Sequence, residues 1–216
     1  MDEDDERESA GLHAVVGLGR TLALSDGIFA ISMTLVAFQI QIPDLRGNQV
    51  HHLGHALRHL GPSYYVFGLT FFVGGAFWMA HHRLFRQLAR ADERLMSLNL
   101  VFLAAIAFLP FPTGVLGRYG GERAAIILYA GVMVAAGVLL GLLTLVAHHR
   151  RLLAPTMTPA GVRLALLRSG TMVAVFAASI PLALAIPKAA PDFWILLFPL
   201  RLFARPRRPH PSKRGT

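Results

Sequence analysis

Two ionisable side chains occur in parts of the sequence that are otherwise apolar enough to cross a membrane. Asp26 lies within the apolar stretch 22–42, and His81 directly follows the apolar stretch 62–80. An ionisable group in a membrane span costs on the order of 3 kcal/mol on insertion scales, so it marks a buried polar network or an ion path. Carboxylates and imidazoles are also the groups that proton relays use. The two residues therefore allow either a relay or a hydrogen-bonded network that locks helices together.

Further polar side chains are expected at the same membrane depth as Asp26. Successive spans run in opposite directions, so the start of the first span, the end of the second and the start of the third all lie at the same membrane face. We favour a locking network over a relay or substrate site, because Asp26 lies on the side of its helix that is opposite to an apolar stripe. The members of the predicted network are Arg20, Ser25, Asp26, His81 and Asn99.

The apolar stripe appears when residues 22–42 are placed on a helix at about 100° per residue. It consists of Gly27, Ile31, Leu35, Phe38 and Ile42, with Thr34 at its edge, whereas Asp26, Phe29 and Met33 lie on the opposite side. An apolar helix face in a membrane protein is most often a packing surface. From the residues alone, the stripe therefore predicts helix packing.

The composition of the chain bounds its class. The sequence of 216 residues is 54% hydrophobic, 15% charged and has a mean hydropathy of +0.51, which is too apolar for a soluble domain of this size. No cysteine is present, which excludes thiolate chemistry and a disulfide scaffold. We therefore expect one all-α integral membrane domain over residues 19–204. Its predicted spans are 22–42, 62–80, 95–116, 123–147 and 169–186, followed by a short, tilted sixth at 193–203.

The net charge of +9 is a membrane-orientation signal and not a nucleic-acid signal. Sixteen Lys and Arg residues fall in the two tails, with Arg20 and Arg201 beside them, and in the linkers on their side, against five in the opposite linkers. This asymmetry predicts an inner-membrane protein with both termini in the cytoplasm, an even number of spans and no nucleic-acid partner. Residues 1–18 are expected to form an acidic, flexible tail with a short amphipathic approach, and residues 205–216 a basic, disordered tail.

Histidines, glycines and prolines carry weaker signals. A short interfacial helix is expected at 50–60, where the histidines at 51, 52, 55 and 59 include pairs four residues apart that suit a divalent cation. No H-E-x-x-H motif or third-ligand cluster accompanies them, so neither a metal site nor an enzyme is predicted.

Close helix approach is expected at two glycine pairs, Gly74-Gly75 and Gly137-x-x-x-Gly141. A kink or a helix end is expected at three prolines, Pro110, Pro112 and Pro181.

Three motifs in order give the sequence a family resemblance. The first, R-x-x-x-L-S-D-G, begins at Arg20 and is similar to the R-x-x-x-F-S-D signature of the transmembrane protein 175 family, with Leu24 in place of the usual Phe. The continuation A-I-x-x-T-L, the later W-x-x-H-H from Trp78, and the segment from Asn99 to F-L-P-F-P-T also resemble that family's first three helices. The resemblance covers about the first 115 residues.

The resemblance implies a function and a quaternary structure. The family comprises potassium channels of endosomes and lysosomes and their bacterial relatives, and its single-repeat members assemble as homotetramers in which helix 1 lines the pore. It implies that Ile31 forms a hydrophobic constriction, that Leu35, Phe38 and Thr34 line the path, and that Arg20, Ser25, Asp26, Gly27, Trp78, His81 and Asn99 form the structural motif.

The expected protein is thus a potassium-permeable cation channel in the lipid bilayer, a homotetramer of six-helix subunits whose only ligand is the permeant K+, without a cofactor. Two alternatives stay open. One is a proton-coupled secondary transporter that uses Asp26 and His81, and the other is a non-conducting membrane oligomer for which the stripe is an interface.

Overall fold

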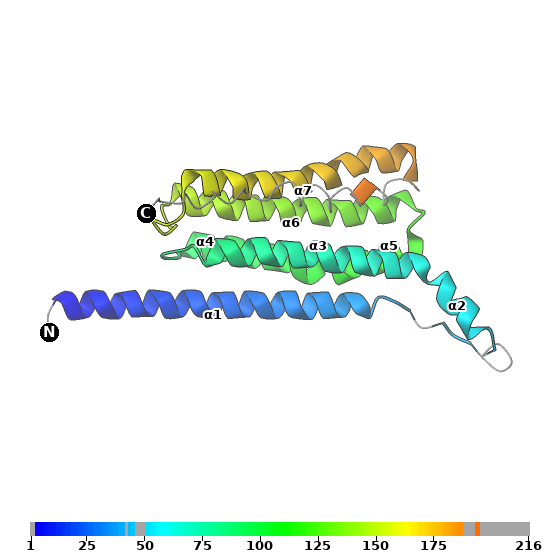
Figure 1. Cartoon of the computed structure of the whole chain (residues 1–216), viewed down its shortest axis with the longest axis horizontal. Helices are drawn as coiled ribbons and strands as arrows, with labels where there is room; N and C mark the ends of the chain where they lie inside the picture. The colour runs from blue at the N-terminus through cyan, green and yellow to red at the C-terminus, as the bar shows by residue number, and fades with distance from the viewer. Residues whose placement is uncertain (1–2, 42, 46–50, 188–192, 195–216) are drawn as a thin grey trace, which may run out of the picture.

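A computed structural model describes residues 3–41, 43–45, 51–187 and 193–194, with the backbone alone for 3–16. The described chain is helical and has no named strand, so the all-α prediction is confirmed. Three layers make up the bundle (Figure 1): α1 forms one outer layer, the middle layer holds α3, α4 and α5, and α6 with α7 forms the other outer layer. The bounds are α1 Glu3–Ala37, α2 Leu53–His59, α3 Gly61–Phe85, α4 Glu93–Phe108, α5 Pro110–Tyr119, α6 Arg123–His149 and α7 Pro159–Ala185.

Five of these segments are long and apolar enough to cross a membrane within the described part of the chain, α4 and α5 counting as one. They correspond to the first five predicted spans. Two of these helices are clearly longer than predicted: α3 continues to Phe85, and α7 already begins at Pro159. The sixth predicted segment, 193–203, and the tail 205–216 lie outside the described residues, apart from Phe193 and Trp194. Buried Trp194 packs on Tyr129 of α6 and Phe176 of α7, with ring centroids 4.9 and 5.6 Å apart.

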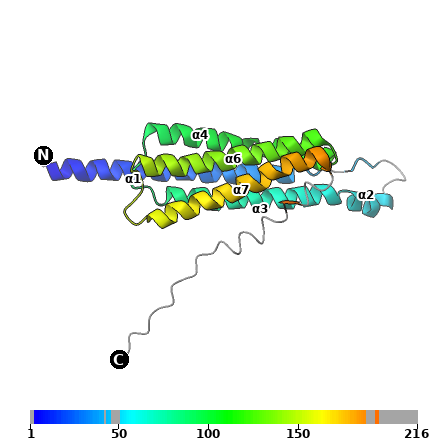
Figure 2. The ribbon, with the colours of Figure 1, turned by 90° about the horizontal axis from the view of Figure 1, so that it is seen from above.

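Both ends of α1 differ from the prediction. Its helix begins at Glu3 and projects beyond the bundle (Figure 2), although residues 1–18 were expected to be a flexible tail. The tail sequence contains three Glu, two Ala and two Leu, which favour helix, and it has no proline, so the helix can extend through it. At the other end α1 stops at Ala37 instead of continuing to residue 42. Tight turns with i to i−3 hydrogen bonds of 3.2 Å follow it, in the approach to Pro43.

The predictions for glycines and prolines are confirmed at Gly137 and Pro110, whereas Pro112 and Pro181 lie inside α5 and α7. Gly74 and Gly75 of α3 lie against Met33 of α1, where a Cβ on either would make ordinary contact at 3.6 to 3.7 Å from the Met33 side chain. Gly137 brings α7 onto α6, because a Cβ there would meet the Val173 side chain at 2.7 Å. Leu109 separates α4 from α5, which starts at Pro110. Gly137 thus permits a close helix contact within the subunit, and Pro110 begins a new helix.

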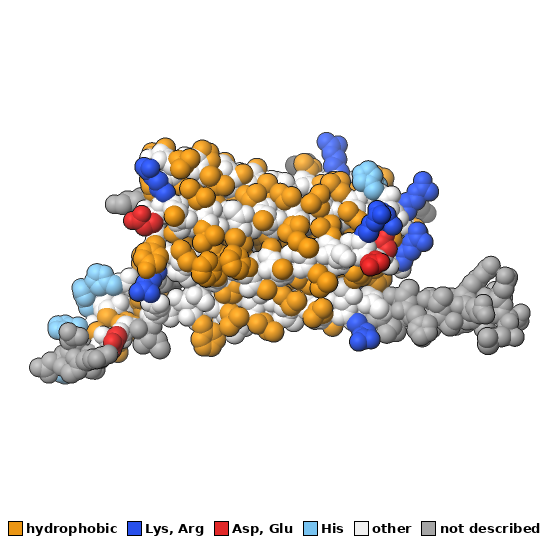
Figure 3. Space-filling view, turned by 180° about the vertical axis from the view of Figure 1, so that it is seen from behind, with side chains coloured by type: hydrophobic (Ala, Val, Ile, Leu, Met, Phe, Trp, Pro, Cys, Tyr) orange, Lys and Arg blue, Asp and Glu red, His pale blue; other side chains and the backbone are white. Residues whose placement is uncertain are grey.

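Charged side chains gather at the two ends of the bundle and apolar ones cover its middle (Figure 3). We call the end that carries the linkers after α3 and α6 the arginine-rich end. Its linkers are joined by a short bridge between Leu88 and Leu153. Asp92 caps α4 by accepting from the Leu95 N–H at 2.9 Å and also pairs with Arg150. These two contacts lower the pKa of the Asp92 carboxyl and tie the loops together.

Candidate functional site: the two faces of α1

The inward face of α1 carries the residues that hold this helix in the bundle. Ser25, Phe29, Ser32 and Val36 are buried, and their spacing follows one side of the helix. Phe29 packs near the rings of Phe102 and His81, at centroid distances of 6.0 and 5.9 Å. The prediction that Phe29 lies away from the apolar stripe is therefore confirmed.

A buried polar cluster joins α1, α3 and α4 beside Phe29. The Asn99 amide donates to Ser25 Oγ at 3.4 Å, and its carbonyl oxygen lies 2.8 Å from His81 Nε2. Ser25 Oγ in turn donates to the Thr21 carbonyl at 2.8 Å. Because the Asn99 side-chain oxygen is an acceptor, His81 donates from Nε2, as a neutral imidazole can. All three members of this Ser25–Asn99–His81 cluster are fully buried.

Two aromatic rings enclose the His81 imidazole. It stacks on Phe85 at a centroid distance of 4.2 Å and on Phe102 at 5.3 Å, with interplanar angles of 24° and 8°. Its Nδ1 is buried and has no hydrogen-bond partner among the described residues. A proton relay needs a chain of partners on both ring nitrogens, so these surroundings suit a locked side chain better than a relay.

Asp26 belongs to a second cluster and not to the first, which corrects the single network predicted from the sequence. It accepts a hydrogen bond from Trp78 Nε1 at 2.7 Å and lies 3.6 Å from His82 Nδ1. The Asp26 side chain is 38% exposed, so this cluster borders solvent or lipid headgroups, unlike the buried one. No hydrogen bond joins Asp26 to His81 in the described part of the chain.

His82 was missed by the sequence analysis, which chose His81 alone. The signal was the spacing of Trp78 and His82, four residues apart and therefore on one side of α3. Their rings are 5.5 Å apart and both face Asp26. A further buried chain of hydroxyls was also missed: Thr70 Oγ1 lies 2.9 Å from the Tyr129 hydroxyl and accepts from Thr113 at 3.3 Å.

Arg20 does not join either cluster within the described residues, which is a second correction. Arg20 is exposed and lies, at 100° per residue, on the same side of α1 as Ile31. Gly27 lies on that side too, and a Cβ added to it would meet nothing within 4 Å. Neither residue has a structural role that the single subunit explains.

The outward face of α1 is the predicted apolar stripe, and the subunit leaves it uncovered. Ile31 is 62% exposed, Leu35 43% and Phe38 76%, and Leu24 at the motif position is 54% exposed. Thr34 is exposed as well, and its hydroxyl donates to the Ala30 carbonyl at 2.8 Å. The stripe ends where the helix ends, since Phe38 is in the turn after Ala37. Ile42, the last predicted member, lies outside the described residues.

The comparisons with known proteins agree with the motifs. The family model described as endosomal/lysosomal potassium channel TMEM175 matches residues 20–110, which include both polar clusters and the outward stripe. A crystal structure of a lysosomal potassium-selective channel TMEM175 homolog from Chamaesiphon minutus superposes on 88% of this chain and all of its own, with a TM-score of 0.77 and 26% identity. Over residues 20–110, the chain is therefore similar to the TMEM175 family.

Two sequence relatives are bacterial proteins named as potassium channels. A potassium channel of Streptomyces collinus is 41% identical over 121 residues, which cover 54% of this chain and 58% of the relative. A potassium channel of Chamaesiphon minutus is 36% identical over 123 residues, 56% of this chain and 61% of the relative. The match thus spans about three fifths of these relatives' length.

Proposed function

We propose that this protein is a potassium-permeable cation channel, a homotetramer in which α1 of each subunit lines a central path. The observation that carries the proposal is the outward stripe of α1, which stays exposed although the opposite side of the same helix is buried. A single helix cannot enclose a path, and symmetric assembly of several copies is the economical way to cover such a face. The names of the two bacterial relatives, both potassium channels, support the permeant ion.

Ile31 is the proposed constriction, and Thr34, Leu35 and Phe38 continue the lining toward the end of α1. Apolar rings of this kind control flux through dewetting and through the cost of removing water from the ion. The Thr34 hydroxyl already donates to its own helix, which leaves its oxygen lone pairs able to accept or to contact a cation. No T-V-G-Y-G segment occurs in the sequence, so a carbonyl filter of that kind is not part of the proposal.

The two polar clusters hold the lining in place. Ser25, Asn99 and His81 tie α1 to α3 and α4, and Asp26 with Trp78 adds a second tie on the same side. Because the clusters lie on the inward face, they set the rotation of α1 and so direct Ile31 outward. Their role is positional, and the ion path does not run through them.

The proposed orientation places the arginine-rich end in the cytoplasm of a bacterial cell, with the protein in the inner membrane. The linkers at that end carry Arg86, Arg90, Arg150 and Arg151, and the adjoining helices carry Arg83, Arg94, Arg163 and Arg168. The excess of positive residues supports this orientation. An accessibility assay on single cysteines, introduced into this cysteine-free chain at Arg90 and at Tyr119, tests it.

The experiment that tests the channel is cation flux into liposomes that contain the purified protein. Potassium, sodium and a large organic cation are compared for the wild type and for Ile31→Asn, with Leu184→Asn as the control because Leu184 is 53% exposed but lies on α7, in the layer away from α1. We expect potassium flux in the wild type, higher or less selective flux in Ile31→Asn, and unchanged flux in the control. If the wild type is a folded tetramer but shows no cation flux, the channel proposal is wrong.

A further inference from the structure

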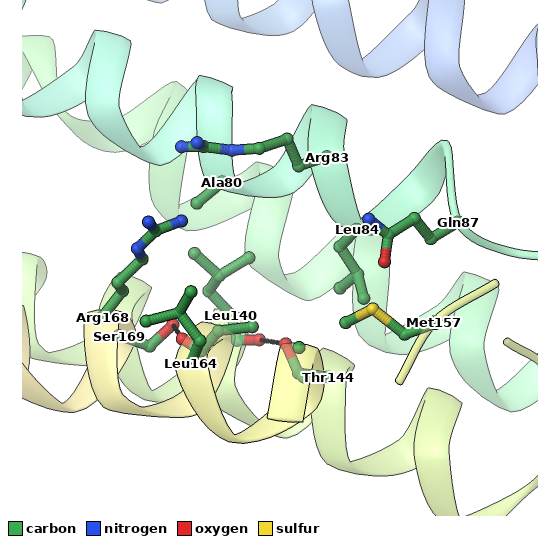
Figure 4. A pocket seen from close by; sticks show the side chains of 12 residues that line it. Ala80, Arg83, Leu84, Gln87, Leu140, Thr144, Met157, Leu164, Arg168 and Ser169 are labelled. Atoms are coloured by element: carbon green, nitrogen blue, oxygen red, sulfur yellow. Dashed lines mark hydrogen bonds between the residues drawn. The ribbon is translucent and has the colours of Figure 1, made fainter. Parts of the chain in front are cut away.

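A cavity at the arginine-rich end lies outside the site described above. It opens between α3, α6 and α7 and has a volume of about 170 Å³. Two arginines from helices far apart in sequence border it, Arg83 near the end of α3 and Arg168 on α7. Figure 4 shows their guanidinium groups turned toward each other. We propose that this cavity binds the headgroup of an anionic glycerophospholipid, with the phosphate between Arg83 and Arg168.

The charge arrangement points to an anion. Like charges held close together repel, and an anion between them replaces that repulsion with two attractions. Arg83 Nε donates to the Met79 carbonyl at 2.9 Å, which fixes the side chain along α3 and sets the direction of its outer nitrogens. Guanidinium groups bind phosphate oxygens with paired, charge-assisted hydrogen bonds.

A polar group in the cavity lining points to a ligand that donates a hydrogen bond. Gln87 lines it, and the side-chain oxygen of Gln87 is buried without a hydrogen-bond partner in the described part of the chain. A buried acceptor left unsatisfied costs free energy, so a ligand that donates to it gains affinity. A headgroup hydroxyl beside the phosphate, as in phosphatidylglycerol, supplies that donor and keeps the net negative charge.

The position of the cavity favours a lipid over a soluble anion. Its remaining wall is largely apolar, with Leu84, Leu140 and Leu164 among the lining residues. It lies at the ends of two candidate membrane spans, α3 and α7. The volume is several times the roughly 30 Å³ share of one water and suits a phosphate with a small alcohol. The acyl chains would lie along the outer surface, where Leu167 is 57% exposed.

The cavity is also on the side that an assembly around α1 leaves free. α7 packs along α6, whereas α1 packs against α3, α4 and α5, so α7 and α1 occupy opposite outer layers (Figure 1). Lipid binding does not require conduction, so this inference is tested independently of the channel proposal.

Native mass spectrometry of the delipidated, purified full chain tests the site. The probes are phosphatidylglycerol, phosphatidylcholine and phosphatidylethanol, the last of which lacks headgroup hydroxyls. We expect phosphatidylglycerol to bind best and Arg83→Gln with Arg168→Gln to weaken its binding by on the order of tenfold for each arginine. The matched control, Arg86→Gln with Arg163→Gln, removes one arginine from the end of α3 and one from α7 outside the cavity and should leave binding unchanged.

Two further measurements make the outcome decisive. Gln87→Met should reduce the preference for phosphatidylglycerol over phosphatidylethanol, and without lipid the Arg83/Arg168 variant should still show a cooperative thermal unfolding transition, so that its loss of lipid is not a loss of fold. Equal loss of lipid in the control pair, or no preference over phosphatidylcholine, would overturn the proposal. Equal stabilisation by inorganic phosphate or glycerol phosphate would overturn the lipid assignment in favour of a soluble anion.

Discussion

The inward face of α1 is buried against neighbouring helices through Ser25, Phe29 and Val36, whereas the outward face leaves Ile31 and Phe38 exposed. The two faces belong to one helix of nearly uniform apolar composition, so composition cannot separate them. What separates them is that only the inward face has polar side chains with partners on α3 and α4. In a membrane, where apolar contact alone gives little preference, such hydrogen bonds and close packing decide which side faces the protein.

The largest contrast is expected between two phenylalanines of this helical segment. Phe29→Ala removes a ring that is 1% exposed and should lower the free energy of unfolding by about 3 to 5 kcal/mol through the cavity it leaves. Phe38→Ala, at a residue that is 76% exposed, should change subunit stability by less than about 0.5 kcal/mol. Thermal unfolding in detergent compares the two. Equal losses would mean that the outward face is also packed within the subunit.

The next effect concerns the buried cluster. Asn99→Leu leaves His81 Nε2 and Ser25 without their partner and should destabilise the protein by about 1 to 3 kcal/mol. Adding His81→Phe should recover part of that loss, because replacing both partners by apolar groups removes the unsatisfied donor. A double-mutant cycle of unfolding free energies measures the coupling, and strict additivity would contradict the cluster.

A smaller effect is expected at the second cluster, which consists of Asp26, Trp78 and His82. Asp26→Asn keeps an oxygen that can accept from Trp78 but removes the charge that faces His82, so the loss should be below about 1 kcal/mol. In a Trp194→Phe background, Trp78 is the tryptophan that remains, and its fluorescence reports on this contact. A proton-coupled carrier would instead lose all transport in Asp26→Asn, and a flux assay under a proton gradient separates the two outcomes.

The smallest effect on the isolated subunit is expected at Gly27. A methyl group there meets nothing within 4 Å, so Gly27→Ala should leave monomer unfolding unchanged or slightly improved by better helix propensity. Gly137→Ala is the matched control that should destabilise, since its methyl would lie 2.7 Å from the Val173 side chain. If copies of α1 pack together at the outward face, Gly27→Ala should change the fraction of protein in the oligomer even though monomer unfolding is unchanged. Light scattering measures that fraction through the mass of the particles.

Much of this architecture could be predicted from the sequence because its signals are local. The apolar stretches located five spans, the glycine pairs located the helix contacts at Met33 and Val173, and the residue spacing placed Ile31 and Phe29 on opposite sides of α1. Periodicity and hydropathy are properties of neighbouring residues, so they need no knowledge of the partner helices.

The pairing of the polar residues was decided by the tertiary structure alone. Asp26, His81 and His82 lie at similar depth, and the sequence cannot say which of two adjacent histidines on α3 faces Asp26. The answer depends on the rotation of α3 against α1, which the packing of Phe29 and the glycine contact at Met33 fix. In the same way, only the fold brings Arg83 and Arg168, on α3 and α7, to the lining of one cavity. Sequence periodicity sets the faces of each helix, and long-range packing decides which faces meet.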